Sequence, residues 1–554
     1  MRIKRTRSGL SVRAISGTYV VLLGINLRES DCPGLRGFAV HRTDHTEGEA
    51  YYLKGLKTFA ATDPGFPPGA SYSTRDHPIQ GFGWSDYTAK PGHLYTYRVE
   101  ALTGPPANLA VSKKVEVTVA TEAPVGGNHD IYFNRGVAAS QAYATRFGNR
   151  KPGEVGQSAY DWLSRGLYEA ILDFIAAATG PGYGLRVAAY EFHYPGVLEA
   201  LRDARARGVD VRIVYDARKE QPKAKNDAAV AVAGLGPPVS KRRTTHQYIS
   251  HNKFIVRMAN GVPEAVLTGG TNFSEGGIFG HSNVVHVVED PVVAAEYLRY
   301  WNLLEPDPTN RVLKPVLTST VPIPSGHPPR GTFAIFSPRS TSDALSFYSR
   351  LAAGANDSLF MTFAFGMNSL FQAVYRTAPS TIRYAVMEKK TRPMARGAAR
   401  DAEEAAIDQL RFQEENLFAI GSRLTQDRFD RWVAESDSGL NSNVRYIHNK
   451  FMLIDPLSSS PVVVAGSANF SEASSDTNDE NMLVIRDNTR VADIYLGEFM
   501  RLYSHHAFRE FLERSGVSSN AASPKHLSLG EWWRDYFGST SRARQRRLFS
   551  GAAI

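Results

Sequence analysis

The sequence contains a single cysteine, Cys32, among its 554 residues. One thiol excludes an intramolecular disulfide framework and a zinc site built from several cysteines, and it is compatible with a reducing compartment. We expect Cys32 to be a small packing residue.

Long apolar runs are also absent. No stretch of eighteen or more uncharged apolar residues occurs, so no transmembrane segment is predicted. The most apolar early stretch, residues 14–27, contains glycine, threonine, tyrosine and asparagine and lacks a good cleavage site, which favours a β-strand over a signal peptide. We therefore expect the protein to be cytoplasmic, or exported by a route without a cleavable signal peptide.

The body of the chain lacks an excess of either charge. The formal net charge is +9, but residues 1–8 and 542–547 each carry four basic and no acidic residues. The remainder has 56 basic and 55 acidic residues, so it offers no obvious extended track for a polyanion. We expect the two basic ends to be mobile and solvated, with contact to anionic lipid or nucleic acid as the alternative.

Length and local pattern indicate several domains. A chain of 554 residues exceeds what one hydrophobic core usually supports. Residues 9–121 contain short β-rich runs separated by glycine, proline and aspartate, and the alternation in residues 94–101 predicts a half-buried antiparallel strand. One face of that strand would carry Tyr95, Tyr97, Val99 and Ala101. This region is predicted to be all-β.

Beyond a linker at residues 121–128, strands alternate with helices. Residues 185–218 and 359–390 each fit a strand, a helix and a second strand, which is typical of α/β folds. A proline-rich stretch at residues 315–331 lies between the two units. The pattern predicts an internal duplication of two α/β halves.

The same four residues, His-Asn-Lys-Phe, occur at 251–254 and again at 448–451. In an extended segment, residues two apart project to the same side, so each copy would present an imidazole beside an ammonium group. A second repeated motif, Asn-Phe-Ser-Glu, begins at Asn272 and at Asn469. In both halves the asparagine follows the histidine by 21 positions, so coincidence is a poor explanation.

These residues resemble the paired HxK and GSxN motifs of the phospholipase D superfamily. The resemblance covers roughly residues 129–515, and it implies two α-β-α halves related by a pseudo-twofold axis. The superfamily includes lipases, nucleases, transferases and inactive relatives, so the resemblance does not fix the substrate. Both motifs lie in one chain, which implies a monomer.

A shorter resemblance lies in the N-terminal region. Residues 90–102, together with Trp84, are similar to a late strand of fibronectin type III sandwiches, which implies a binding or spacer module. The expected domains are a fibronectin type III-like sandwich (1–122), a first phospholipase D-like half (129–310), a second half (325–515) and an aromatic and basic extension (516–554).

The chemistry of a phosphodiester fits the repeated motifs. Cleavage needs a nucleophile on one side of phosphorus, a proton donor on the leaving oxygen and donors around the other oxygens. One histidine would form a phosphohistidine and the other would protonate the leaving alkoxide, while lysines and asparagines hold the phosphoryl oxygens. No metal or other cofactor is implied. The predicted catalytic residues are His251, Lys253, Asn272, His448, Lys450, Asn469, Asp455, Ser467 and Glu480.

The two halves differ in three places. The second half has the acid Asp455, the motif serine Ser467 and Glu480, a carboxylate that in relatives orients a histidine. In an alignment of the halves, the first half has Met258, Gly270 and Ser282 instead, with Thr271 as a partial substitute for the hydroxyl. Without a carboxylate neighbour, His251 is expected to hold a proton less readily than His448.

This asymmetry has two interpretations. One is a division of labour, in which a neutral His251 attacks and a carboxylate-supported His448 is the acid. The other is decay toward a binding protein. We favour activity because His251, Lys253 and Asn272 are all present, although which histidine attacks is left open.

Other candidates have simpler interpretations. A metal site among His246, His281 and His286 is disfavoured because their spacings fit no common zinc motif. Glu191 and Glu388 follow related strands and are interpreted as solvated strand ends, with a place in the cleft as the alternative. The aromatic cluster at residues 531–538 is expected to dock on a domain rather than grip a lipid or a base.

The resulting hypothesis is a metal-independent phosphodiesterase that hydrolyses or transfers a phospholipid headgroup. Phospholipid is favoured over nucleic acid because the body is nearly neutral, and peripheral contact with an anionic membrane is possible through the basic ends. The alternatives are a nuclease of the same superfamily and a catalytically silent lipid- or nucleic-acid-binding relative.

Overall fold

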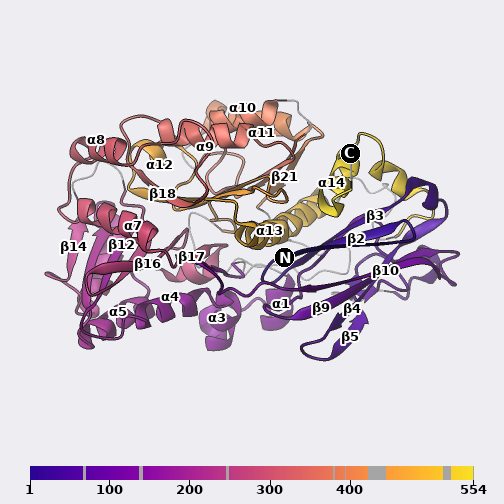
Figure 1. The fold of residues 1–554 in the computed structure, drawn as a ribbon, viewed down its shortest axis with the longest axis horizontal. Helices are drawn as coiled ribbons and strands as arrows, with labels where there is room; N and C mark the ends of the chain where they lie inside the picture. The colour runs from indigo at the N-terminus through magenta and orange to yellow at the C-terminus, as the bar shows by residue number, and fades with distance from the viewer. Residues whose placement is uncertain are drawn as a thin grey trace.

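The structure is a computed structural model, and it describes residues 1–65, 70–136, 141–244, 249–377, 381–392, 395–421, 445–515 and 526–552. Figure 1 shows a β-rich N-terminal region on one side of the molecule and two α/β bodies stacked on the other, with helix α13 (Thr489–Ser515) between them. None of the described helices is long and apolar enough to cross a membrane.

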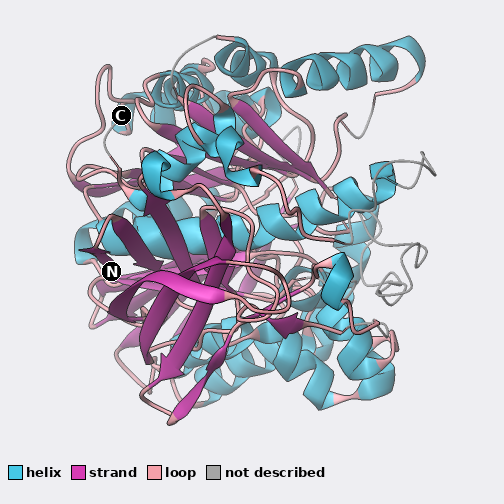
Figure 2. Ribbon diagram, turned by 90° about the vertical axis from the view of Figure 1, so that its right-hand side faces the viewer, coloured by secondary structure: helices cyan, strands magenta, loops and turns pink. Residues whose placement is uncertain are grey.

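The N-terminal region consists of two antiparallel sheets of four strands each, with a short pair beside them. Figure 2 shows these strands in front of the helices of the two α/β bodies. Strand β9 confirms the predicted alternation, because Tyr95, Tyr97, Val99 and Ala101 are all fully buried. The likeness to fibronectin type III stays a prediction. The first sheet has the order β1 (Arg2–Arg7), β2 (Leu10–Ser16), β3 (Val21–Leu27), β8 (Gly83–Asp86); the second has β10 (Ala110–Ala120), β9 (Leu94–Thr103), β4 (Leu35–Asp44), β5 (Glu49–Tyr52); the short pair is β6 (Lys54–Gly55) and β7 (Tyr72–Ser73).

Two seven-stranded mixed sheets follow, and their strand orders correspond one to one. In each sheet three parallel strands continue into an antiparallel set, as the predicted strand–helix–strand units require. The α/β duplication predicted from the sequence is therefore present. The first sheet has the order β11 (His129–Phe133), β17 (Val284–Val288), β16 (Val262–Gly269), β15 (Lys253–Ala259), β12 (Tyr183–Ala189), β13 (Asp210–Asp216), β14 (Ser240–Arg243); the second has β18 (Gly331–Ser337), β24 (Glu480–Arg486), β23 (Val462–Gly466), β22 (Phe451–Ile454), β19 (Ser358–Phe363), β20 (Ile382–Met387), β21 (Asn416–Ile420).

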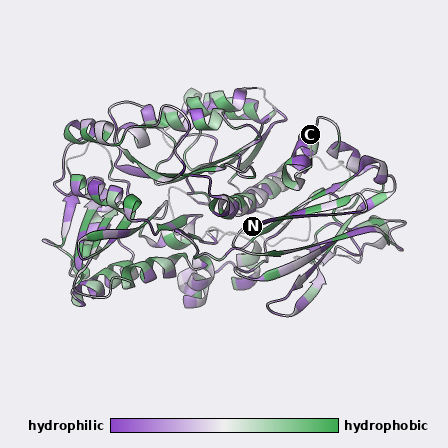
Figure 3. Cartoon of the chain, viewed as in Figure 1, coloured by the Kyte–Doolittle hydropathy of each residue, from purple (hydrophilic) through white to green (hydrophobic). Residues whose placement is uncertain are grey.

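Helices cover both faces of these sheets. Most pack on the outer faces, whereas α7 and α13 lie in the layer between the two sheets, where they share one large apolar core with both. Figure 3 shows hydrophobic residues along the strands of both sheets and on the helices that cover them. The other helices are α1 (Gln141–Phe147), α2 (Pro152–Val155), α3 (Gln157–Ser164), α4 (Leu167–Ala176), α5 (Pro195–Ala206), α6 (Glu220–Val232), α7 (Pro291–Leu304), α8 (Asn310–Thr320), α9 (Asp343–Ala353), α10 (Ser369–Arg376), α11 (Gly397–Arg411), α12 (Glu472–Asp476) and α14 (Ser541–Ser550), with short turns at Glu29–Asp31, Ala60–Thr62, Gly276–Gly280 and Trp532–Tyr536.

The expectation of mobile basic ends is wrong for the described residues. The N-terminal run forms the edge strand β1, and Arg2 pairs with the buried Asp493 of α13 at 2.7 Å. The C-terminal arginines belong to α14, which packs on β3. The nearby aromatic cluster docks as expected, since Trp533 is buried in the core of the N-terminal sheets. Apolar contacts hold both ends, and at the N-terminus the pair of Arg2 with the buried Asp493 adds to them.

Candidate functional site

The two histidine motifs meet where the halves contact each other. The backbone N–H of His251 donates to the carbonyl of Asp479 at 2.9 Å, and that of His448 donates to the carbonyl of Ser282 at 3.2 Å. Each motif is thus hydrogen-bonded to the other half. In this region each first-half residue has its counterpart 197 positions later, as His251 and His448 show, so the two contacts are equivalent. The two equivalent backbone hydrogen bonds show that the halves are related by a pseudo-twofold axis.

In each half, a carboxylate at the end of a parallel strand holds the backbone of the residue that precedes the motif histidine. Asp216, the last residue of β13, accepts from the N–H of Ser250 at 2.8 Å. Glu388, after β20, accepts from the N–H of Ile447 at 2.9 Å and from the two preceding amides. Glu388 is therefore buried and structural, which corrects its interpretation as a solvated strand end. Its counterpart is Asp216, not Glu191.

His251 is supported by a carboxylate. Its Nδ1 lies 2.9 Å from Oε2 of Glu480, which is fully buried in the second half. A carboxylate only accepts, so Nδ1 carries the proton and Nε2 is left with its lone pair. Ser467 donates to the same carboxylate at 2.6 Å and keeps it in place. Burial lowers the pKa of His251 to about 4, although Glu480 acts to raise it.

His448 is supported by an amide instead. Its Nδ1 lies 3.1 Å from Oδ1 of Asn283, whose nitrogen donates to the carbonyl of Gly277 at 2.7 Å. Because that donation fixes the amide's orientation, the oxygen faces the histidine and Nδ1 of His448 donates. Burial, with added repulsion from Lys450 and His281, holds the pKa of His448 well below its usual range.

These contacts correct two expectations. The counterpart of Glu480 is Asn283, one residue beyond Ser282, and the carboxylate serves the histidine of the opposite half. His251, not His448, is therefore the histidine with carboxylate support. Thr271 does not replace the missing hydroxyl, because it donates to the carbonyl of Val284 at 2.9 Å.

Both lysines are buried beside the histidines. Nζ of Lys253 donates to the carbonyl of His251, and that of Lys450 donates to the carbonyl of His448 at 2.6 Å. Burial lowers the pKa of Lys253 to about 7, and burial and repulsion from Lys253 lower that of Lys450 well below its usual range. Lys450 also lowers the pKa of His251, so the four side chains share one site. Such a cluster is short of negative charge and would be stabilised by an anion.

The two motif asparagines carry matching unused polar groups. The side-chain oxygens of Asn272 and Asn469 are buried, and neither has a hydrogen-bond partner among the described residues. Buried polar atoms are seldom left unpaired, and those that are need a functional explanation. The same unpaired acceptor occurs at both pseudo-symmetric positions, so neither amide is held in place by a hydrogen bond to its oxygen.

Asp455 does not join this group. It follows the far end of β22, where its carboxylate accepts from the N–H groups of Asn356 at 2.9 Å and of Asp357 at 2.7 Å. Asp455 thus holds the start of β19 and has no contact with the histidines. The prediction that Asp455 is catalytic is therefore replaced by a structural role. Met258, which stands at the equivalent position of the first half, does not remove a catalytic group.

The remaining sequence candidates lie around the site. The ring of His281 is tilted against that of His448 with centroids 4.4 Å apart, and Ser274 donates to Glu191 at 2.6 Å. His286 bonds to His129 and to Tyr495, on the far side of the sheet. His246 lies outside the described residues.

Sequence reasoning missed Asn283, Asp216 and Tyr190. The ring of Tyr190 lies 5.0 Å from that of His251 and 5.2 Å from Nζ of Lys253. The shift of 197 residues, applied to Glu480, would have identified Asn283. The sequence contains no comparable signal for Asp216 or Tyr190.

A cavity of about 910 Å³ opens beside Asn469. Phe365, Met367 and Phe470 give it apolar walls, and Arg392 adds a basic side chain that pairs with Glu403. Pockets of this size admit small organic ligands, so there is room for more than a phosphate group next to the motifs.

A family model described as the PLD-like domain of cardiolipin synthase matches residues 171–304 and 354–503. The two matched segments make up just over half of the chain and contain both motif pairs. The chain belongs to the phospholipase D superfamily.

Solved structures resemble this phospholipase D-like chain to differing extents. A polyphosphate kinase from Porphyromonas gingivalis is 11% identical with a TM-score of 0.37, and the match covers 71% of this chain but only 53% of the kinase. A phosphatidylserine synthase from Haemophilus influenzae is 14% identical with a TM-score of 0.44, covering 62% of this chain and 85% of the synthase. Nuc from Salmonella typhimurium, a phospholipase D family member, is 29% identical with a TM-score of 0.20, covering 24% of this chain and 84% of Nuc. A search of curated proteins found no match.

Proposed function

We propose that the protein is a metal-independent phosphodiesterase that hydrolyses or transfers a phospholipid headgroup through a phosphohistidine. The observation that carries this proposal is the reciprocal arrangement of the two motifs. It gathers two histidines and two lysines at one buried site, and each motif asparagine has a buried side-chain oxygen with no partner among the described residues.

The geometry favours His251 as the nucleophile. Its Nδ1–H is held by Glu480, so Nε2 is the free nitrogen and the carboxylate stabilises the positive ring that forms on attack. A bond forms between Nε2 and phosphorus while the bond from phosphorus to the leaving oxygen breaks. His251 is thus the better-supported attacking group, for a different reason from the one the sequence suggested.

His448 then serves as the acid. In the unliganded site its pKa is depressed by burial and by nearby cations, so it is neutral at pH 7. A phosphodiester brings a negative charge that offsets those cations and raises the pKa of the imidazole. The protonated ring gives its proton to the departing alkoxide, then takes a proton from water or an acceptor alcohol, which attacks phosphorus and releases His251.

The lysines and asparagines bind the phosphoryl oxygens. Lys253 and Lys450 supply charge, and the side-chain NH2 groups of Asn272 and Asn469 donate to the phosphoryl oxygens, so the transferred group has donors from both halves. Removing one such donor typically lowers the rate about 100- to 1000-fold. This donor set supports catalysis without a metal ion.

A phospholipid fits the surroundings of the site better than a nucleic acid does. Outside the chain ends the protein has nearly equal numbers of basic and acidic residues, so no extended positive track for a polyanion is evident. The cavity beside Asn469 has apolar walls formed by Phe365, Met367 and Phe470. An apolar wall next to the phosphate donors suits a diester that continues into a lipid.

The test uses the full chain with EDTA present. Vesicles of phosphatidylcholine and phosphatidylglycerol are incubated with ethanol, and single- and double-stranded DNA and RNA are incubated separately. Phosphatidylethanol or released headgroup supports the proposal, whereas shortened nucleic acid without lipid turnover replaces it with a nuclease. No turnover of any substrate would support a binding protein.

Two variants test the mechanism. His251→Asn and His448→Asn are expected to abolish turnover, while His327→Asn, at an exposed position, keeps it. With a radiolabelled p-nitrophenyl phosphodiester, whose leaving group needs no acid, His448→Asn should accumulate acid-labile label on the protein. Full activity in either motif variant, or loss of activity with EDTA, would overturn the mechanism.

A further inference from the structure

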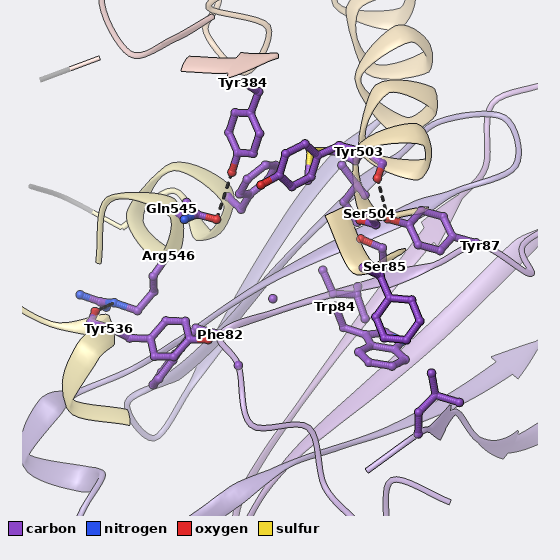
Figure 4. A pocket seen from close by; sticks show the side chains of 18 residues that line it. Phe82, Trp84, Ser85, Tyr87, Tyr384, Tyr503, Ser504, Tyr536, Gln545 and Arg546 are labelled. Atoms are coloured by element: carbon purple, nitrogen blue, oxygen red, sulfur yellow. Dashed lines mark hydrogen bonds between the residues drawn. The ribbon is translucent and has the colours of Figure 1, made fainter. Parts of the chain in front are cut away.

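A second cavity, of about 550 Å³, lies away from the motifs, where three parts of the chain meet. It is bounded by the N-terminal strands β3 and β8, by α13 with Tyr384 of β20, and by the C-terminal segment that ends in α14. No predicted catalytic residue lines it. Figure 4 shows Arg546, Gln545 and Tyr536 on one side of the pocket and Trp84, Tyr87 and Ser504 on the other.

Most of the lining is aromatic or aliphatic. Trp84 and Tyr503 are among the lining residues, and Phe82 and Tyr536 pack together with ring centroids 5.1 Å apart. Apolar walls enclosing several hundred cubic ångströms are typical of a small-molecule site. The lining therefore fits the apolar part of a ligand.

On the side of the pocket toward Tyr87 the polar groups satisfy one another. The hydroxyl of Tyr87 donates to Oγ of Ser504 at 2.7 Å and contacts the carbonyl of Met500 at 3.0 Å. A ligand group placed there would have to break existing hydrogen bonds, which costs free energy. This side is suited to an apolar tail.

On the opposite side of the pocket, two hydrogen-bond donors have no partner among the described residues. Gln545 uses its oxygen to accept from Tyr384 at 3.1 Å, and its amide nitrogen has no partner among the described residues. The hydroxyl of Tyr503 likewise has none there, and it is not sealed from solvent. Both residues line the cavity, so each can offer a donor to a ligand there.

Arg546 adds a positive charge on this side. Its Nε donates to the carbonyl of Tyr536 at 2.8 Å, Nη1 contacts Asn26, and the guanidinium lies 4.3 Å from the ring centre of Phe537. No described carboxylate lies within salt-bridge distance of Arg546, although other arginines of α14 have such partners. Burial and the neighbouring Arg547 lower the pKa of this guanidinium, and Cys32 and Glu29 offset that lowering only in part, so a nearby anion would stabilise the charge.

We propose that this cavity binds a single-chain amphiphilic carboxylate, with the tail toward Trp84 and Tyr87 and the carboxylate near Arg546. One guanidinium and two neutral donors suit a monoanion with two oxygens. The site is independent of the proposed phosphodiesterase activity. It lies between the N-terminal sheets and α13, so an occupant would stabilise their contact.

The test measures binding of decanoate to the full chain by calorimetry below its micelle concentration. We expect one saturable site, with binding to decan-1-ol at least about tenfold weaker because the alcohol carries no charge for Arg546. Thermal unfolding with and without decanoate should show a rise in the unfolding temperature. Absence of saturable binding, or equal affinity for the alcohol, would overturn the proposal.

Two variants locate the site. Arg546→Gln should weaken decanoate binding about tenfold or more, while Arg547→Gln, on the same helix but outside the lining, should leave it unchanged. Gly81→Leu places a side chain at the lining, where a Cβ would meet only ordinary contacts such as the Tyr536 hydroxyl at 3.4 Å, and should block the tail. If Arg546→Gln fails to fold, Gly81→Leu decides alone. Unchanged binding in Gly81→Leu would show that the ligand lies elsewhere.

Discussion

Glu480, in the second half of the duplicated body, accepts a hydrogen bond at 2.9 Å from Nδ1 of His251, in the first half. The equivalent contact on the other side joins His448 to the amide oxygen of Asn283 at 3.1 Å. The two histidines therefore have the same geometry but different electrostatic support. That difference sets their expected roles.

Removing the charge of Glu480 tests the role of His251. Glu480→Gln keeps the shape but removes the carboxylate that stabilises a positive imidazole, so we expect the rate of phosphohistidine formation to fall roughly 100- to 10,000-fold. Single-turnover kinetics with a labelled diester measure this step. Ser467→Ala leaves the carboxylate and should cost much less. Equal losses in both variants would contradict an electrostatic role.

Adding a charge at Asn283 tests His448. Asn283→Asp would place a carboxylate beside Nδ1 of His448 and raise its pKa, so the ring stays protonated to higher pH. If His448 is the acid, the alkaline limb of the rate profile should move to higher pH. The measurement is kcat against pH, with the unchanged protein as the reference. An unmoved alkaline limb would argue against His448 as the acid.

Replacing the asparagine between the motif histidine and lysine is expected to change the free energy of unfolding differently in the two halves. Asn252 donates to Tyr300 at 3.1 Å and accepts from Asn481 at 2.9 Å, whereas neither polar atom of the fully buried Asn449 has a partner among the described residues. Asn252→Leu should therefore lower the free energy of unfolding by about 1–3 kcal/mol. Asn449→Leu should leave it unchanged or raise it. Denaturant unfolding compares the two, and a larger loss for Asn449→Leu would contradict this assignment.

The buried pair of His129 and His286 should make the folded protein less stable at acidic pH. Their ring nitrogens lie 2.9 Å apart, and burial lowers the pKa of His129 to about 4. An unfolded histidine titrates near 6.5, so between about pH 6.5 and 4 the unfolded chain binds a proton that the folded chain does not. Stability is thus complete above pH 6.5 and falls as pH drops toward 4, by up to about 1.4 kcal/mol per unit for this residue.

His129→Gln removes that proton uptake and should flatten the dependence of the unfolding free energy on pH in this window. His327→Gln, at an exposed position, is the matched control and should keep the original slope. An identical slope in both variants would show that His129 does not contribute.

Much of the architecture could be predicted from the sequence because its signals are local. The alternation of residues 94–101 and the paired strand–helix–strand units depend on neighbouring residues, and the structure confirms both. The repeated motifs indicated a duplicated site for the same reason. The mobile ends were predicted wrongly because the partners of Arg2 and of α14 are distant in sequence.

The repeated motifs show in the sequence that a histidine, a lysine and an asparagine occur twice at equal spacing, and the strand–helix pattern predicts two α/β halves. Which residues support which histidine becomes visible when the halves pack together. Glu480 lies 32 positions after His448 but contacts His251, because the halves pack across a pseudo-twofold axis and exchange their supporting side chains. Spacing along a chain cannot reveal such an exchange, since hydrogen bonding depends on distance in space.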